Sequence, residues 1–132
     1  MRAAEMIMTY PEDIAVDRET LATAIHAATE CAQACTACAD ACLAEESVAD
    51  LRRCIALNLD CASVCRATAE VLSRHTAADV AVTRAVLEAC IAACRSCGAE
   101  CGHHAGMHEH CRVCAEACRS CEEACSALLG VL

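Results

Sequence analysis

The sequence predicts an all-α protein, an antiparallel up-down-up-down four-helix bundle with a cysteine-lined core and a short N-terminal arm. A chain of 132 residues fits one domain. Alanine is the commonest residue, while only four Gly and one Pro are present, a composition that favours helices. The 16 cysteines recur at steps of three and four, the period of the inward-facing side of a bundle helix. With no Trp, no Phe and one Tyr, the core cannot be rich in aromatic side chains.

The chain divides into an arm and one domain. Residues 1–16 are predicted to form the arm, with at most one turn at Pro11–Asp13. Residues 17–132 are predicted to form a single bundle domain, and its short loops make consecutive helices antiparallel neighbours. The four helices are expected at about 17–45, 47–75, 76–102 and 107–130.

Local signals set these boundaries. Asp17 is a plausible N-cap for the first helix. Ser47–Asp50 and Thr76–Asp79 match the capping box, in which a hydroxyl caps the first turn and a carboxylate reaches back. Gly102 is predicted to end the third helix and Gly130 the fourth.

All the cysteines belong to this helical repeat, and only the second helix departs from it. Asn58 stands where the pattern predicts a cysteine. The sulfurs therefore occupy positions where Leu and Val would normally form the core. We predict that all of them bind metal: Cys31, Cys35, Cys38, Cys42, Cys54, Cys61, Cys65, Cys90, Cys94, Cys97, Cys101, Cys111, Cys114, Cys118, Cys121 and Cys125.

Beyond the cysteines, the inward side of each helix continues with mainly apolar residues. Because the helices alternate in direction, these residues are expected at one end of the bundle, where they form an apolar plug. They are Leu21, Ala24, Thr68, Leu72, Val80, Leu87 and Leu128.

The opposite end, the mouth, is expected to place Cys42, Cys54, Cys101 and Cys111 beside the His-rich segment 102–110. Met107 falls on the inward side one turn before the last of these cysteines, and His110 lies close to that side. Further metal ligands are predicted here: His104, Met107, His108 and His110. Asn58 is a candidate polar auxiliary, either hydrogen-bonded or weakly ligating.

Charge and targeting signals narrow the classes of function. A net charge of −9 argues against binding nucleic acid. Acidic residues such as Glu45 and Glu46 do not lie on the cysteine-bearing side of the helices and are predicted to form a solvated face. No window of about 18 apolar residues indicates a membrane span, and Glu5 interrupts any signal-peptide core. We therefore expect the cytosol, where thiols stay reduced.

Four other uses of the thiols fit the sequence less well than Cu(I) binding. Cysteines as plain core residues would cost stability at each site, and neighbours at i and i+4 poorly match disulfide geometry. The spacing is helical throughout, unlike the compact cysteine run of a ferredoxin. Four-cysteine zinc sites would each bury a net charge of roughly −2, which is energetically very costly. Zinc sites at the His-rich mouth remain an alternative.

Cu(I) avoids the charge problem of zinc. It is soft and monovalent and prefers sulfur ligands. When each thiolate bridges two metals and each metal takes two thiolates, about one Cu(I) binds per Cys and the filled core is close to neutral. Binding expels the thiol protons, so the thiols need not be ionised beforehand. Multiple Cu(I) ions are thus the predicted ligands.

Residues 17–130 resemble the cytosolic copper storage proteins. The resemblance rests on CAQACTACADAC at 31–42, CIAACRSCGAEC at 90–101 and CRVCAEACRSCEEAC at 111–125, with HHAGMHEH before the last helix. It implies a tube of Cu(I)–thiolate clusters, a homotetramer of bundles, and a role in storing Cu(I) and limiting copper toxicity. Asn58 departs from the cysteine pattern and cannot supply a thiolate.

The predicted function is cytosolic storage and sequestration of many Cu(I) ions, without catalysis and with copper exchange to a chaperone. One alternative is a low-stoichiometry copper chaperone, which needs only one or a few exposed sites. Another is a thiol redox enzyme, for which Cys111 near a helix start and several His is the candidate. A zinc or iron–sulfur protein is the third alternative.

Overall fold

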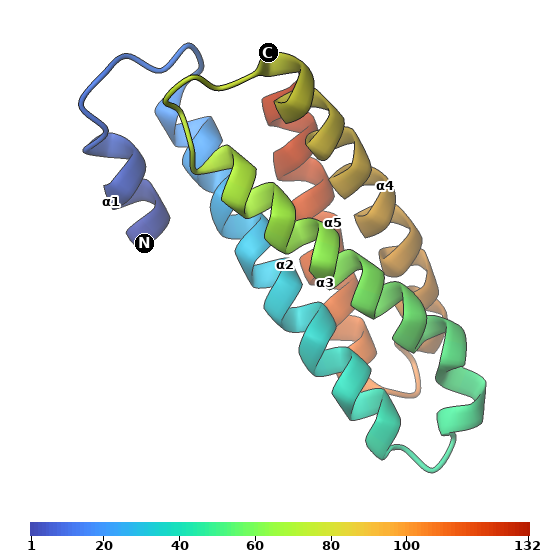
Figure 1. The fold of residues 1–132 in the computed structure, drawn as a ribbon. Helices are drawn as coiled ribbons and strands as arrows, with labels where there is room; N and C mark the ends of the chain where they lie inside the picture. Colours follow the sequence, from blue (N-terminus) through green and yellow to red (C-terminus); the bar gives the residue numbers. More distant parts are fainter.

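The computed structural model describes all 132 residues and contains helices only. Four long helices lie side by side as a bundle, and a short helix lies against one end of it (Figure 1). No helix is both long and apolar enough to span a membrane. The elements are α1 (Arg2–Met8), α2 (Arg18–Ala44), the 3₁₀ turn η1 (Val48–Leu51), α3 (Arg52–Leu72), α4 (Val80–His104) and α5 (Glu109–Leu129).

Pairs of thiols show that neighbouring helices run in opposite directions. Cys54, near the start of α3, has its sulfur 3.6 Å from that of Cys101, near the end of α4. Cys90, in the first half of α4, has its sulfur 3.9 Å from that of Cys125, near the end of α5. The α2–α3 and α4–α5 connections therefore share one end of the bundle, as Figure 1 shows. The predicted all-helical fold is confirmed, and this arrangement is compatible with the predicted up-down-up-down order.

The helix starts agree with the sequence at one cap and differ at two. The carboxylate of Asp17 accepts a hydrogen bond from the backbone N–H of Thr20 at 2.9 Å, and this bond lowers the pKa of Asp17. Ser47 makes no such bond and precedes a 3₁₀ turn. The predicted cap at Thr76 is also wrong, because Asp79 itself caps α4 through its carboxylate. The error at Thr76 arises because an acidic residue three positions after a hydroxyl can serve as the cap itself. At Ser47–Asp50 neither side chain caps a helix, since a 3₁₀ turn leads directly into α3.

The third and fourth helices also differ in their bounds. Ala77 has a φ of 59°, so the chain turns after the second long helix before α4 can start. Gly102 does not end α4, since no Gly in the chain takes a positive φ, and the helix continues to His104. α5 accordingly begins at Glu109 rather than near residue 107. Gly130 does cap the last helix, as predicted.

The N-terminal arm contains more structure than predicted. Residues 2–8 form α1, which buries Ile7 against the bundle. Arg18, at the start of α2, donates from its guanidinium to the carbonyl oxygens of Ile7 (2.8 Å), Tyr10 (3.1 Å) and Glu12 (2.6 Å). The arm is therefore tied to the closed end of the bundle, and no local signal at Pro11–Asp13 predicts this.

The closed end is the expected apolar plug. Leu21, Leu72, Leu87 and Leu128 are all buried, with Ala24 and Thr68 beside them. Val80 was predicted to belong to the plug, but it is 58% exposed because it is the first residue of α4 and faces solvent.

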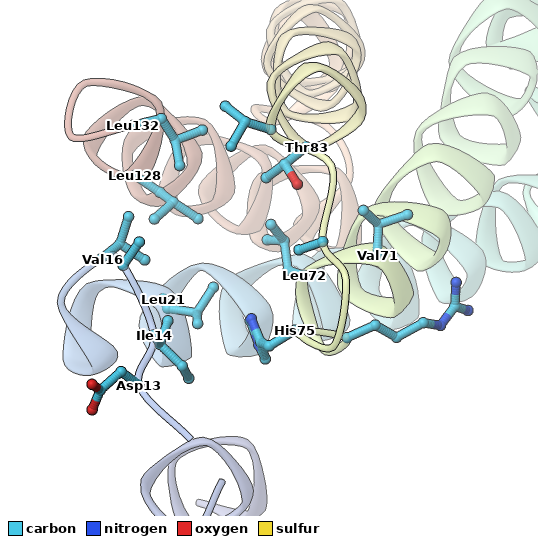
Figure 2. Close-up of a pocket in the computed structure, with 14 residues that line it drawn as sticks. Asp13, Ile14, Val16, Leu21, Val71, Leu72, His75, Thr83, Leu128 and Leu132 are labelled. Atoms are coloured by element: carbon cyan, nitrogen blue, oxygen red, sulfur yellow. The ribbon is translucent and has the colours of Figure 1, made fainter. Parts of the chain in front are cut away.

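A cavity of about 280 Å³ lies next to the plug, between the arm, the α3–α4 connection and the C-terminus (Figure 2). His75 lies among its apolar side chains, and its Nε2 is buried without a hydrogen-bond partner. Burial lowers the pKa of His75, because the charged imidazolium would lose hydration there.

Candidate metal centre

The bundle encloses one continuous column of sulfur atoms. All 16 cysteines are free and buried. Neighbouring sulfurs within a helix and between helices lie 3.6–4.0 Å apart, for example Cys54 with Cys101 and Cys31 with Cys61. The column exists because steps of three and four keep each thiol on the same inward side of its helix. The predicted inward position of the cysteines is thus what the structure shows.

The sulfurs converge into groups in which every Sγ lies within 4.8 Å of the others. Cys31, Cys35 and Cys118 each belong to two groups of four. Metal ions placed in neighbouring groups must therefore share thiolates, so bridging is built into the geometry. Five of these groups, from the mouth inward, are Cys38–Cys42–Cys54–Cys111, Cys38–Cys101–Cys114, Cys35–Cys97–Cys114–Cys118, Cys31–Cys35–Cys61–Cys118 and Cys31–Cys65–Cys94–Cys121.

Asn58 takes a thiol position and satisfies its amide with thiols. Its Oδ1 accepts from the Sγ–H groups of Cys97 at 3.0 Å, Cys114 at 3.3 Å and Cys101 at 3.4 Å. Its Nδ2 donates to Cys54 Sγ at 3.8 Å. The side chain is fully buried, so this is a polar insertion into the sulfur column and not a break in it.

One histidine at the mouth reaches the sulfurs. His110 Nδ1 lies 3.4 Å from Cys38 Sγ and 3.6 Å from Cys111 Sγ. Its Nε2 lies 2.9 Å from Glu45 Oε2, and the same oxygen lies 2.8 Å from Nδ1 of His108. These hydrogen bonds, led by the one with His110, lower the pKa of Glu45.

Three of the four predicted mouth ligands do not reach the column. His108 contacts Glu45 and Ser47 instead. His104 is the last residue of α4, and its Nε2 is hydrogen-bonded to Glu100 at 2.9 Å on the same helix. Met107 was expected on the inward side of the last helix, and that placement is wrong. Its side chain is 79% exposed, because α5 starts only at Glu109 and residue 107 stands in the connection.

Glu45 and Glu100 are features of the site that sequence reasoning missed. The acidic residues were interpreted as a solvated face, yet these two carboxylates bind the histidines of the mouth. Two signals were available. Glu45 follows Cys42, the last cysteine of α2, by three residues, and Glu100 stands four positions before His104, the spacing at which side chains of one helix meet. The pairing of Glu45 with its histidines joins distant parts of the chain and leaves no other mark in the sequence.

Cys111 lacks the environment of a reactive thiol. Burial, together with the nearby Cys42 and Cys54, raises its pKa to about 12. Burial likewise raises the pKa of Cys42. A redox nucleophile needs a lowered pKa and an accessible sulfur, whereas Cys111 is fully buried. The thiol redox interpretation therefore has no support at this residue.

A helical bundle that buries free thiols in overlapping groups of three or four is the architecture of a soft-metal-binding protein. The chain belongs to the copper storage protein family, whose model matches residues 17–130. None of the curated proteins matches it at a significant level.

Solved structures of one bacterial protein are similar over nearly the whole chain. The copper storage protein Ccsp from Streptomyces lividans, loaded with 10 copper equivalents, is 62% identical, with a TM-score of 0.96 over 98% of this chain and 99% of that chain. A five-copper structure of this cytosolic copper storage protein is 66% identical, with a TM-score of 0.84 over 85% and 93%. A Ccsp variant in which two histidines are replaced by alanine is 64% identical, with a TM-score of 0.89 over 90% and 100%.

Proposed function

We propose that this protein stores and sequesters many Cu(I) ions as thiolate clusters inside its bundle. One observation carries the proposal: the 16 buried thiols form one connected column, in which each sulfur lies within 4.8 Å of at least one other. Membership of the copper storage protein family supports it. The function is binding without turnover, which protects against copper toxicity and buffers the copper supply.

The charge of the filled core favours Cu(I) over zinc. Cys31, Cys35 and Cys118 are shared between groups, so metals in neighbouring groups are bridged by thiolates. Bridging thiolates with a monovalent metal give about one Cu(I) per Cys and a nearly neutral core. The core contains no buried Lys or Arg side chain that could balance the negative charge of zinc thiolates.

The ligands we propose are all 16 cysteines, with His110 as the nitrogen ligand at the mouth. His104 and His108 are proposed as outer ligands that meet copper at the rim of the mouth, and Met107 offers its thioether from the solvent side. Asn58 acts as the polar auxiliary, because its Oδ1 already faces three thiols.

The relatives support the proposed storage of copper in this fold. Ccsp loaded with 10 copper equivalents has a TM-score of 0.96 with this chain. We place the protein in the cytosol, as its relative is described. The homotetramer and the exchange of copper with a chaperone are further parts of the proposal, and they derive from the family resemblance.

A low-stoichiometry chaperone is the second candidate, and the mouth group is the observation in its favour. Cys38, Cys42, Cys54 and Cys111 together with His110 would suffice to hold one or two Cu(I) ions. A chaperone has no use for the further thiols buried beneath this group, so storage accounts for more of the structure.

The experiment is an anaerobic titration of the reduced, copper-free protein with Cu(I) in competition with a Cu(I) chelator. Storage predicts uptake of roughly one Cu(I) per Cys. Saturation at one or two ions would reject storage and leave the chaperone. A parallel titration with Zn²⁺ serves as the control for metal selectivity and is expected to show much lower uptake.

A further inference from the structure

We infer that Glu45 is a positioning residue that holds His108 and His110 in opposite tautomers and so aims their free ring nitrogens in different directions. This inference rests on the proposed storage of copper and identifies the residue that orients two histidines at the mouth of the bundle. Glu45 touches no thiol and acts through the two rings.

A single carboxylate oxygen binds both rings. Glu45 Oε2 lies 2.8 Å from Nδ1 of His108 and 2.9 Å from Nε2 of His110. The two rings are stacked, with centroids 5.5 Å apart and planes at 21°. A carboxylate only accepts hydrogen bonds, so both of these nitrogens carry a proton.

A neutral imidazole has one N–H and one nitrogen with a free lone pair. His110 is therefore protonated at Nε2, and its Nδ1 directs a lone pair at the sulfurs of Cys38 and Cys111, 3.4 and 3.6 Å away. His108 is protonated at Nδ1, which leaves the lone pair on Nε2. That nitrogen lies 3.5 Å from Ser47 Oγ, in the connection that follows α2.

The two tautomers thus give the mouth one nitrogen donor toward the thiols and one toward the connecting loops. Histidines that bind metals commonly donate their other ring N–H to a carboxylate, which fixes the ring and strengthens the ligand. Here one carboxylate does this for two rings at once. Cu(I) that arrives as a complex can exchange a ligand of its donor for a ring nitrogen and then for a thiolate sulfur, and the thiol proton passes to water.

The backbone explains why Glu45 can reach both rings. It is the residue that ends α2, with extended backbone angles, and its N–H still bonds to the carbonyl oxygen of Cys42 at 3.2 Å. Its carboxylate therefore leaves the helix and reaches the start of α5, where His108 is the N-cap residue and His110 lies in the first turn.

Two neighbouring carboxylates provide comparisons. Glu100 bonds to one ring only, His104 on its own helix, and shares its carboxylate with Arg53 at 3.4 Å. Glu46 is exposed and follows Glu45 directly in the sequence. Replacement of Glu46 therefore removes the same charge from the same connection without touching the histidines, so it is the matched control.

The first measurement uses the copper-free protein. ¹⁵N NMR of the histidine rings at neutral pH is expected to show Nε2–H for His110 and Nδ1–H for His108. In Glu45→Ala both rings should become mixtures of tautomers, Glu45→Asp should restore part of the preference, and Glu46→Ala should resemble the wild type. Unchanged tautomers in Glu45→Ala would overturn the inference.

The second measurement is the rate of copper uptake from a Cu(I)–bicinchoninate complex, followed by stopped flow. Loss of a group that orients a metal ligand typically lowers metal affinity or activity 10–100-fold. We expect at least about a tenfold slower first phase in Glu45→Ala, with the final copper number unchanged and Glu46→Ala unaffected. Mixed tautomers with a wild-type rate would also overturn the inference. Failure of storage would show differently, as a low final copper number in the wild type.

Discussion

The two ends of the bundle are built from the same four helix sides but hold different chemistry. At the mouth the inward positions carry thiols, with Cys38, Cys42, Cys54 and Cys111 in one group. At the closed end they carry leucines, such as Leu87 and Leu128, which are fully buried. Helix geometry determines which side chains face inward. The residue type then determines whether an inward position can bind a soft metal, as Cys does, or closes the end of the bundle, as Leu does. We therefore expect copper to enter at the mouth.

The polar contacts around the two ends differ as well. At the mouth, carboxylates bind histidine rings, as Glu45 does with His108 and His110. At the closed end, Arg18 binds backbone carbonyls of the arm, and His75 buries an unpartnered nitrogen. The polar groups at the mouth therefore orient histidine rings beside the thiols, whereas those at the closed end hold the arm against the bundle.

The largest expected effect is a loss of stability at the plug that leaves the copper number unchanged. Leu128→Ala should lower the free energy of unfolding of the copper-free protein by about 2–5 kcal/mol, because it removes buried volume from the plug. Urea unfolding under reducing conditions measures this, and Leu59→Ala, at an exposed position, is the control. The copper number should stay the same. Loss of several Cu(I) ions in the Leu128 variant would show that the two ends are not independent.

A smaller effect is expected at the polar position in the sulfur column. Asn58→Ala should lower the free energy of unfolding by about 1–3 kcal/mol, because three thiol donors lose their acceptor in a buried site. Asn58→Cys should instead add about one Cu(I) at saturation. Native mass spectrometry of the loaded protein counts the metals, and an unchanged count in Asn58→Cys would mean that the position does not contact the clusters.

Removal of one thiol should have the opposite pattern to Leu128→Ala, with a small loss of stability and a clear loss of bound copper. Cys118→Ala loses only one sulfur atom from the core, so we expect about 1 kcal/mol of lost stability without metal. Because Cys118 belongs to two groups, about two Cu(I) should be lost at saturation. The chelator titration measures the count. An unchanged copper number would contradict the bridging role of this thiol.

The smallest effect concerns pH at the closed end. Burial lowers the pKa of His75, with Arg18 nearby acting in the same direction, so the folded chain binds fewer protons than the unfolded chain. Stability must then decrease as the pH falls below about 6.5. Unfolding at pH 7.5 and 5.5 should show a smaller decrease in His75→Gln than in the wild type. His26→Gln, at a half-exposed helix position, should behave like the wild type, and an equal decrease in all three proteins would contradict the assignment.

The bundle itself could be predicted because its determinants are local and repeated. Steps of three and four place Cys90, Cys94, Cys97 and Cys101 on one side of a helix whatever surrounds them. Burial of all the thiols follows from this period, as does the position of Asn58 among them. The cap at Asp17 was also predictable, because it depends on residues three positions apart.

Other features are decided by contacts between distant parts of the chain. Thr76 and Asp79 both have capping chemistry, and the turn at Ala77 decides between them. Exposure of Met107 depends on where α5 begins, which short-range signals define only to within a few residues.

The sequence by itself determined the helical bundle, the inward column of thiols and the apolar plug, since a helical period acts through neighbours three and four residues apart. Only the tertiary structure decided which thiols share a group, how the arm is held and which carboxylate faces which histidine. These depend on distances between residues such as Glu45 and His110, which are 65 positions apart in the chain. No local pattern encodes such a distance, because it is set by how the helices pack.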